Sequence, residues 1–194
     1  MIQLQPPFRL ATPDDAPTLA ELVNIAGDGL PLHVWRRLAE DSADPWELGR
    51  QRQAAKAAEG QIVVADHGEG AVAGLTGYAI GVSPDSVGED VPPLFRPLME
   101  LENAALSSWY VNVLACFPAQ RGKGLGSGLL RIAEEIARDA GVARMSVIVA
   151  DTNAGARRLY AREGYAETDT RPCVKNGWIG DVDNWILMIK PLAA

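Results

Sequence analysis

The sequence predicts an α/β fold in which a mixed β-sheet is covered by helices. The first supporting observation is the order of apolar patterns, which runs strand, helices, two strands, strand–helix–strand–helix, strand, strand. The second is a glycine-rich turn that joins a strand expected at 109–116 to an amphipathic helix expected at 126–140. The chain has 194 residues, 47% of them hydrophobic, which suits a single domain spanning 1–194.

The elements expected before the glycine-rich turn begin with a short strand at 8–11. Thr12 and Pro13 then supply a helix start, with Thr12 as the N-cap, and Gly27 ends that helix. A second helix is expected around Leu32, Trp35 and Leu38, and a third runs from 44 to 60. Strands follow at 62–65 and 72–82. The stretch 83–107 is acidic and irregular, with a short helix at 98–103.

After the turn, the pattern predicts strands at 145–150, 166–170 and 185–189. Asn153 is expected to cap a short helix that continues to Arg162, because Asn is a preferred N-cap residue. A loop is expected at 172–183.

Composition and charge exclude several functional classes. A net charge of −7 disfavours a general nucleic-acid or membrane-surface binder and suits a cationic acceptor such as an amine. No apolar run approaches the ~20 residues of a membrane helix. No secretory signal follows Met1, and the two cysteines, Cys116 and Cys173, are too few for a disulfide framework. We therefore expect a cytoplasmic protein.

The segment 120–127, Gln-Arg-Gly-Lys-Gly-Leu-Gly-Ser, predicts an anion site. Glycines at alternate positions expose the backbone at a helix N-terminus, and two cations stand beside it, an arrangement that suits a phosphate or pyrophosphate. A P-loop is excluded because Phe117 replaces its first glycine and Gly124 its Ser/Thr. A dinucleotide fingerprint is excluded because its last glycine falls on Ser127 or Leu129.

The run 120–126 resembles the acetyl-CoA loop of the GNAT superfamily of N-acetyltransferases, Gln/Arg-x-x-Gly-x-Gly/Ala. The flanks carry the resemblance further: 113–116 followed by Pro118, the segment 153–165 and the opening 9–15 all match the family pattern. The resemblance implies the acyl-CoA N-acyltransferase fold. That fold has a mostly antiparallel sheet of about seven strands, splayed between strands four and five. The resemblance also implies acetyl transfer from acetyl-CoA to a primary amine by direct attack in a ternary complex.

The same resemblance implies the site residues. Tyr160 matches the tyrosine that protonates the leaving thiolate, and a backbone N–H near Leu114 or Ala115 is the candidate oxyanion donor. The positions that would hold acetyl-CoA are Val113, Leu114, Ala115, Cys116, Gln120, Arg121, Gly122, Lys123, Gly124, Leu125, Gly126, Ser127, Asn153 and Tyr160.

The general base is left open by the sequence. Some relatives carry His or Glu on strand four, whereas this chain offers Tyr110 and Asn112, which share one face of the strand. Glu100 or Glu102 is an alternative, acting through a water. The missing base motivates a second hypothesis, a CoA-binding sensor with little turnover. A longer acyl-CoA donor is a third.

Other residues are given structural roles. Cys116 is interpreted as a small core residue rather than an acetyl carrier. His33 and His67 are isolated, so no metal site is expected. Trp35 and Trp178 lie in the variable segments and are the candidates to wall an acceptor pocket. The expected acceptor is a small-molecule amine, with peptide or protein amines open, and the resemblance is compatible with a homodimer.

Overall fold

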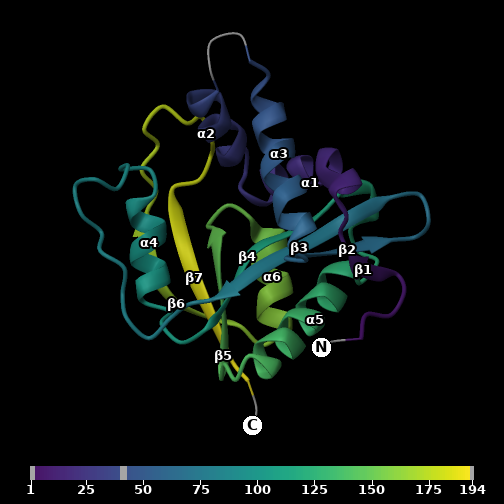
Figure 1. Cartoon of the computed structure of the whole chain (residues 1–194). Helices are drawn as coiled ribbons and strands as arrows, with labels where there is room; N and C mark the ends of the chain where they lie inside the picture. The colour runs from purple at the N-terminus through teal and green to yellow at the C-terminus, as the bar shows by residue number, and fades with distance from the viewer. Residues whose placement is uncertain (1–2, 40–42, 193–194) are drawn as a thin grey trace. The chain divides into compact units, whose positions relative to one another are not determined.

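The computed structural model describes residues 3–39 and 43–192, so the ends of the expected domain lie outside the described residues. It contains a seven-stranded sheet with the order β1-β2-β3-β4-β5-β7-β6 (Figure 1). The β4–β5 ladder is parallel, and the β1–β2, β2–β3, β5–β7 and β6–β7 ladders are antiparallel. The predicted fold class, a mostly antiparallel sheet of about seven strands with helices, is confirmed.

The described elements follow the expected order closely. The strands are β1 (Phe8–Leu10), β2 (Ile62–Asp66), β3 (Ala71–Ala79), β4 (Trp109–Cys116), β5 (Arg144–Ala150), β6 (Ala166–Pro172) and β7 (Asn184–Pro191). The α-helices are α1 (Ala16–Ala26), α2 (Leu30–Leu38), α3 (Pro45–Ala58), α4 (Arg96–Asn103), α5 (Leu125–Asp139) and α6 (Ala154–Arg162). Two short 3-10 turns, η1 (Pro13–Asp15) and η2 (Pro118–Gln120), precede α1 and the glycine-rich turn.

Most elements differ from the expected bounds by one or two residues, and two differ by three. Thr12 and Pro13 start the 3-10 turn η1 rather than α1 itself, which begins at Ala16. Strand β3 ends at Ala79 instead of residue 82. Its pairing fades gradually, since the Ile80 N–H still donates to the Ser108 carbonyl at 2.8 Å, and Pro84 then turns the chain away.

The chain forms two compact units, which we describe separately. Unit one holds the chain up to Gly77 together with Val113–Ile132, and unit two holds Tyr78–Asn112 and the chain from Ala133 onward. Strand β4 and helix α5 each continue from one unit into the other. The glycine-rich turn therefore belongs to unit one, and α4 and α6 belong to unit two.

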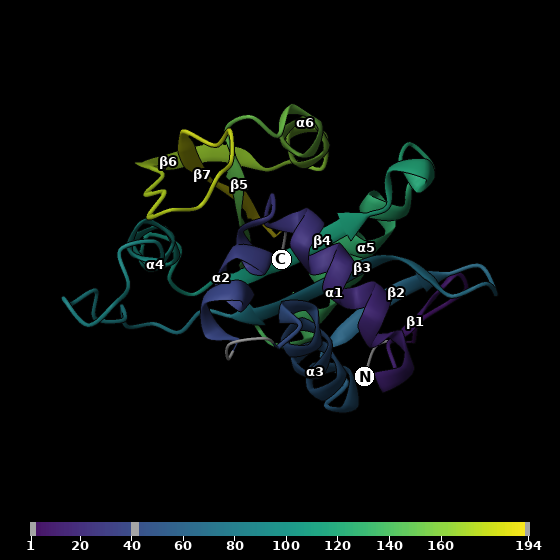
Figure 2. The ribbon, with the colours of Figure 1, turned by 90° about the horizontal axis from the view of Figure 1, so that it is seen from above.

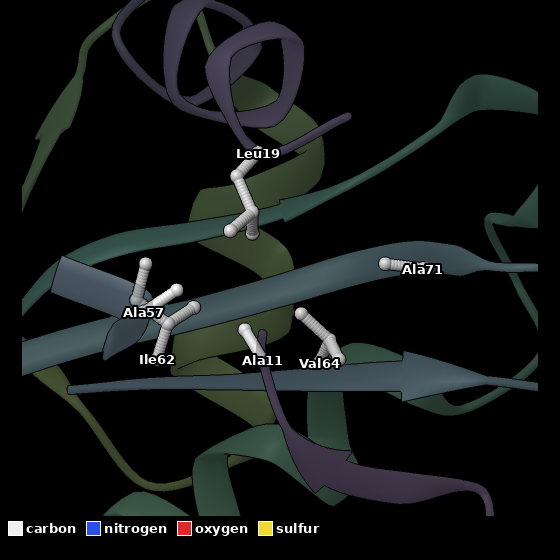
Figure 3. Close-up of a cluster of buried hydrophobic side chains, with 6 residues drawn as sticks. All are labelled: Ala11, Leu19, Ala57, Ile62, Val64 and Ala71. Atoms are coloured by element: carbon white, nitrogen blue, oxygen red, sulfur yellow. The ribbon is translucent and has the colours of Figure 1, made fainter. Parts of the chain in front are cut away.

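Unit one is built around strand β2, in which Ile62–Ala65 are all buried. A strand buried on every residue has both faces covered, which explains why this segment is a continuous apolar run rather than an alternating one. Figure 3 shows one cluster of this core, with Leu19 of α1 directed at the sheet. Its members are Ala11, Leu19, Ala57, Ile62, Val64 and Ala71.

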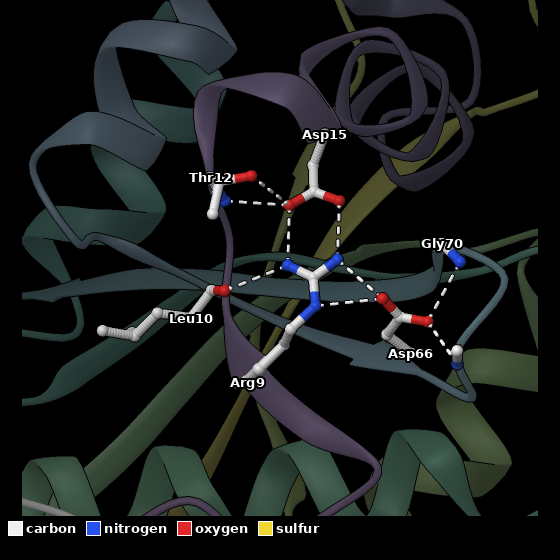
Figure 4. Close-up of polar contacts among 7 residues, drawn as sticks. Arg9, Leu10, Thr12, Asp15, Asp66 and Gly70 are labelled. Carbon is white, nitrogen blue, oxygen red and sulfur yellow. Dashed lines mark hydrogen bonds and ion pairs between the residues drawn. The ribbon is translucent and has the colours of Figure 1, made fainter.

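A polar network fixes the start of unit one (Figure 4). The Arg9 guanidinium donates to both carboxylate oxygens of Asp15, at 2.7 and 2.8 Å, and to Asp66 at 2.7 and 3.0 Å. Asp66 also accepts from the backbone N–H groups of Gly68 and Gly70. Arg9 thus joins β1 to η1 and to the β2–β3 turn, which gives the Arg-x-Ala-Thr-x-x-Asp opening a structural reason.

Replacing Arg9 by Met is expected to destabilise the protein by about 1–2 kcal/mol, since Asp15 is only 8% exposed and would lose its partner. Arg9 lowers the pKa of Asp15 through its hydrogen bonds. The difference in stability should therefore be full above about pH 4 and shrink as pH falls further. Urea unfolding at pH 7 and pH 3 measures both effects. Arg50→Met is the control, because half-buried Arg50 also contacts two acids, but both of these acids are exposed, and its loss should leave the midpoint near wild type.

Unit two is built on the antiparallel strands β5, β7 and β6, and α4 and α6 lie on either side of β7 (Figures 1 and 2). Its core includes Met145, Leu187 and Met188. The hydroxyls of Ser108 and Ser146 form a buried 2.6 Å hydrogen bond just ahead of the β4–β5 ladder. Arg171 of β6 donates to Glu100 of α4 at 2.8 Å and so holds α4 against the strands.

The two tryptophans expected to wall an acceptor pocket are both engaged in packing. Trp35 is buried in unit one, where its ring lies at the position that a Cβ on Gly49 would occupy. Trp178 is buried in unit two and stacks on Trp185, with ring centroids 6.0 Å apart. Their burial gives each of them a structural role.

Candidate active site

The glycine-rich turn has a backbone that only glycine adopts easily. Gly122 and Gly124 have φ values of +77° and +81°, in the left-handed region. A Cβ at either position would meet nothing within 4 Å, so both face open space. A side chain there would strain the backbone and occupy that space. The turn therefore leaves its backbone uncovered by side chains at these two positions.

Helix α5 begins directly after the turn. The Gly128 N–H donates to the Gly124 carbonyl at 3.0 Å, so the positive end of the helix dipole lies at the turn. The helix start is held by β1, because the Phe8 ring lies where a Cβ on Gly128 would be, at 2.4 Å. The side chains of Arg121 and Lys123 are exposed, and the Lys123 ammonium donates to Gln120 at 2.6 Å. The predicted anion site thus has a fixed helix end and two cations.

Strand β4 continues toward the turn beyond its ladder with β5. That ladder pairs Trp109–Val111 with Met145–Val147. The remaining residues of β4, up to Cys116, lie past its end, which is where the resemblance expects strands four and five to part. On its other side β4 keeps contact with β3, since the Phe117 N–H donates to the Val72 carbonyl. The segment Val113–Cys116 therefore belongs to β4 but not to its ladder with β5.

Cys116 has the environment of an unreactive thiol. Burial raises its pKa, and the nearby cations Arg121 and Lys123 only partly oppose this effect. A thiol with a raised pKa is protonated at neutral pH and is a poor nucleophile. The structure thus supports an unreactive Cys116 rather than an acetyl carrier, although its side chain is half-buried and not part of the core.

Tyr160 lies on α6 in unit two, and Asn153 is the N-cap of that helix. The Asn153 side chain accepts from the Ala156 N–H at 3.1 Å and so caps the helix, as predicted. Tyr160 is 5% exposed, and burial raises its pKa well above the ordinary value. Its ring lies 5.6 Å from that of Tyr165, measured between centroids. A tyrosine so placed is a protonated hydroxyl throughout the physiological pH range, as a proton donor requires.

Tyr110 and Asn112 lie two residues apart on β4 and therefore share one face of the strand, as the sequence predicts. Tyr110 is 6% exposed and Asn112 is exposed. Burial raises the pKa of Tyr110 strongly, and the Glu102 carboxylate adds to the effect. Neither side chain is a proton acceptor at neutral pH, because the tyrosine stays protonated and an amide does not ionise.

The structure separates the two glutamates that sequence reasoning treated as equal. Glu100 is paired with Arg171, whereas Glu102 accepts a 2.8 Å hydrogen bond from the Tyr78 hydroxyl. Tyr78 is not among the site residues that the sequence predicts. Its ring packs edge-on against that of Tyr110, with centroids 5.4 Å apart. A signal was present in the expected pairing of the two neighbouring strands, each of which carries a tyrosine among apolar residues.

Two searches of the described residues gave negative results. No group of three or more His, Cys, Asp or Glu side chains within 3–39 and 43–192 is arranged to hold a metal ion. In the same residues, every helix is too short or too polar to cross a membrane.

Comparison with known families defines the class of protein. The family model of the acetyltransferase (GNAT) family matches residues 30–165. The chain therefore belongs to the GNAT acetyltransferase family and is an acyltransferase, as the sequence predicted. A search of the curated proteins gave no match.

Solved structures give the particular likenesses. The ribosomal-protein-alanine N-acetyltransferase from Brucella melitensis is 23% identical, with a TM-score of 0.61 over 95% of this chain and 99% of that one. YncA from Salmonella typhimurium, solved with its cofactor acetyl-CoA, is 21% identical with a TM-score of 0.60 over 96% and 93%. The PaiA N-acetyltransferase from Thermoplasma acidophilum, in complex with coenzyme A, is 14% identical, with a TM-score of 0.59 over 95% and 97%. These likenesses agree with the fold and with acetyl-CoA as the acyl donor.

Proposed function

We propose that this protein is a single-domain N-acetyltransferase that transfers the acetyl group of acetyl-CoA to a primary amine. The observation that carries the proposal is the turn before α5. Two glycines there adopt left-handed backbone conformations with open space above them, in a chain of the GNAT family. We assign the pyrophosphate of acetyl-CoA to this turn, where the helix dipole and Arg121 and Lys123 offer positive charge.

We propose that backbone groups and two side chains bind the rest of the acetyl-CoA molecule. The pantetheine amides pair with the β4 backbone at Val113–Cys116, which lies past the β4–β5 ladder. The N–H of Leu114 or Ala115 donates to the thioester oxygen as it becomes negative. Tyr160, buried and protonated, gives a proton to the leaving thiolate. Asn153 keeps its capping bond to the Ala156 N–H and is the second side chain assigned to the cofactor site.

On the acceptor side, we propose that Tyr110 and Asn112 orient the amine. Their shared face on β4 supports this role. The acceptor is a small-molecule amine in this proposal, consistent with the net charge of −7. Two similar structures are named as ribosomal-protein-alanine N-acetyltransferases, so the panel of test acceptors also includes peptide amines. The proposed setting is the cytoplasm, with no nucleic-acid or membrane partner, and with a homodimer as the state to check by light scattering.

The test is release of free thiol from acetyl-CoA in the presence of amines. The panel holds spermidine, putrescine, an aminoglycoside, a peptide with a free N-terminal alanine and an N-terminally blocked lysine peptide. The proposal predicts thiol release that depends on at least one amine. Parallel assays with longer acyl-CoA donors check the acetyl preference, which the proposal expects to appear as the highest kcat/KM.

The second candidate function is a CoA-binding sensor. One observation favours it: β4 presents Tyr110 and Asn112, and neither is a base at neutral pH. Acetyl-CoA binding without amine-dependent thiol release across the panel would favour the sensor and contradict the enzyme.

A further inference from the structure

Glu102 stands out in unit two as a half-buried carboxylate without a cationic partner. In the described part of the chain no arginine or lysine pairs with it, whereas its neighbour on α4, Glu100, is held by Arg171. A carboxylate that leaves water normally finds a cation, because desolvating an unpaired charge is costly. The absence of a partner here leaves Glu102 available to a positive group that comes from outside the protein.

The groups around Glu102 form an ordered set. The Tyr78 hydroxyl of β3 donates to its Oε2 atom at 2.8 Å, and the Tyr78 ring packs edge-on against Tyr110 of β4. One carboxylate is thus fixed beside two aromatic rings. Carboxylates and aromatic faces are the protein groups that attract an ammonium ion.

A second acid is held beside this set. The backbone N–H and C=O of Asp85 exchange two 2.8 Å hydrogen bonds with the Asn103 side chain at the end of α4. These bonds tie the chain after β3 to α4. The charge of the Asp85 carboxylate raises the pKa of both Glu102 and Tyr78. The surroundings of Glu102 are therefore negative and aromatic, and they suit a cation.

The electrostatics agree with a proton-accepting role. Burial raises the pKa of Glu102, the Tyr78 hydrogen bond lowers it, and the charge of Asp85 raises it. A carboxylate with a raised pKa is a stronger base than a solvated one, and its pKa lies closer to neutral pH. Tyr78 and Tyr110 stay protonated because burial and Glu102 both raise their pKa values. Glu102 is thus the group in this set that is able to take up a proton.

We propose that Glu102 binds the ammonium group of the acceptor and takes its proton, and that Tyr78 positions the carboxylate for this step. The proposal rests on the proposed function and names its acceptor class, a cationic primary amine. The amine nitrogen loses two protons overall. One passes from the ammonium to Glu102 and on to water. The nitrogen then bonds to the acetyl carbon, the carbon–sulfur bond breaks, and the second proton ends on the sulfur of CoA.

The test compares Glu102→Gln with Glu100→Gln, two equivalent changes two residues apart on α4. With spermidine and the free-N-terminal alanine peptide as probes, we expect kcat/KM at pH 7 to fall about 100-fold in Glu102→Gln. In Glu100→Gln we expect kcat/KM to stay within about threefold of wild type, since Glu100 is paired with Arg171. The acetyl-CoA Kd should be unchanged in both variants. The gap should narrow as pH approaches the pKa of the probe amine, because solution then supplies the free amine.

Two further variants shift the pH profile in opposite directions without removing the carboxylate. Tyr78→Phe loses the hydrogen bond that lowers the pKa of Glu102, so the acidic limb of kcat/KM should move to higher pH. Asp85→Asn keeps both backbone bonds to Asn103 and loses the charge, so the limb should move to lower pH. Because Tyr78 is 45% exposed, Tyr78→Phe should keep the melting temperature of wild type, and a thermal melt checks each variant.

The outcomes are distinguishable. If wild type acetylates no amine, the proposed function fails and this inference fails with it. If wild type is active and Glu102→Gln equals Glu100→Gln, or loses the same factor at every pH, the inference alone is overturned. A limb that Tyr78→Phe and Asp85→Asn leave in place, or move the same way, also overturns it.

Discussion

Gly124→Val is expected to weaken acetyl-CoA binding by about 100-fold or more. Gly124 has a φ of +81°, and a side chain at this position projects into the space assigned to the pyrophosphate. Valine would occupy that space and push the backbone out of the left-handed region, since β-branched residues rarely adopt it. Both effects act at the N-terminus of α5, where the proposed anion contacts are made. Titration calorimetry with acetyl-CoA measures the loss.

Gly141→Val is the matched control for this change. Gly141 follows α5, has a φ of +71°, and would also place a Cβ in open space. It carries the same backbone strain without belonging to the turn, so its acetyl-CoA affinity should equal that of wild type. Wild-type affinity in Gly124→Val would contradict the assignment of the turn to the pyrophosphate.

Tyr160→Phe is expected to lower kcat by about 100- to 1000-fold while the acetyl-CoA Kd changes less than about threefold. The hydroxyl is the proposed proton donor to the leaving thiolate, and burial keeps it protonated. Phenylalanine preserves the ring packing against Tyr165 and removes only the donor. Steady-state kinetics at saturating acetyl-CoA, together with the binding titration, separate the two quantities.

Tyr165→Phe provides the control, because the two tyrosines are neighbours in the same core. The Tyr165 hydroxyl is buried and has no hydrogen-bond partner among the described residues. Its removal should leave kcat unchanged and stability equal or slightly higher, since an unsatisfied buried hydroxyl costs free energy. Equal kcat values for Tyr160→Phe and wild type would make Tyr160 a structural residue.

The sequence predicts local structure well where one physical signal dominates. Strand β4 has the expected bounds because a run that is apolar apart from Asn112 ends at Pro118, and α6 starts where Asn153 caps it. The insertion of β7 between β5 and β6 is different. That order depends on pairing between distant segments, and no local pattern encodes it. Only the family resemblance made a mostly antiparallel sheet an expectation.

The candidate site also has one part that the sequence predicts and one part that only the structure shows. The glycines of 120–127 reveal the anion site because the required backbone conformation restricts the residue type. The contacts around Glu102 could not be predicted from the sequence. Tyr78 and Glu102 are 24 residues apart in the chain, and Arg171 and Glu100 are 71 apart. Such contacts appear only when α4 is placed against the strands. The same placement separates one glutamate as paired and the other as available.

The central claim is acetyl transfer to an amine, and the most direct test is to measure both products of one reaction. Wild-type protein is incubated with acetyl-CoA and each amine of the panel, free thiol is counted, and the acetylated amine is quantified by mass spectrometry. The proposed function predicts one amide formed for each CoA released with at least one amine. Acetyl-CoA binding with no amide formed from any amine would contradict it.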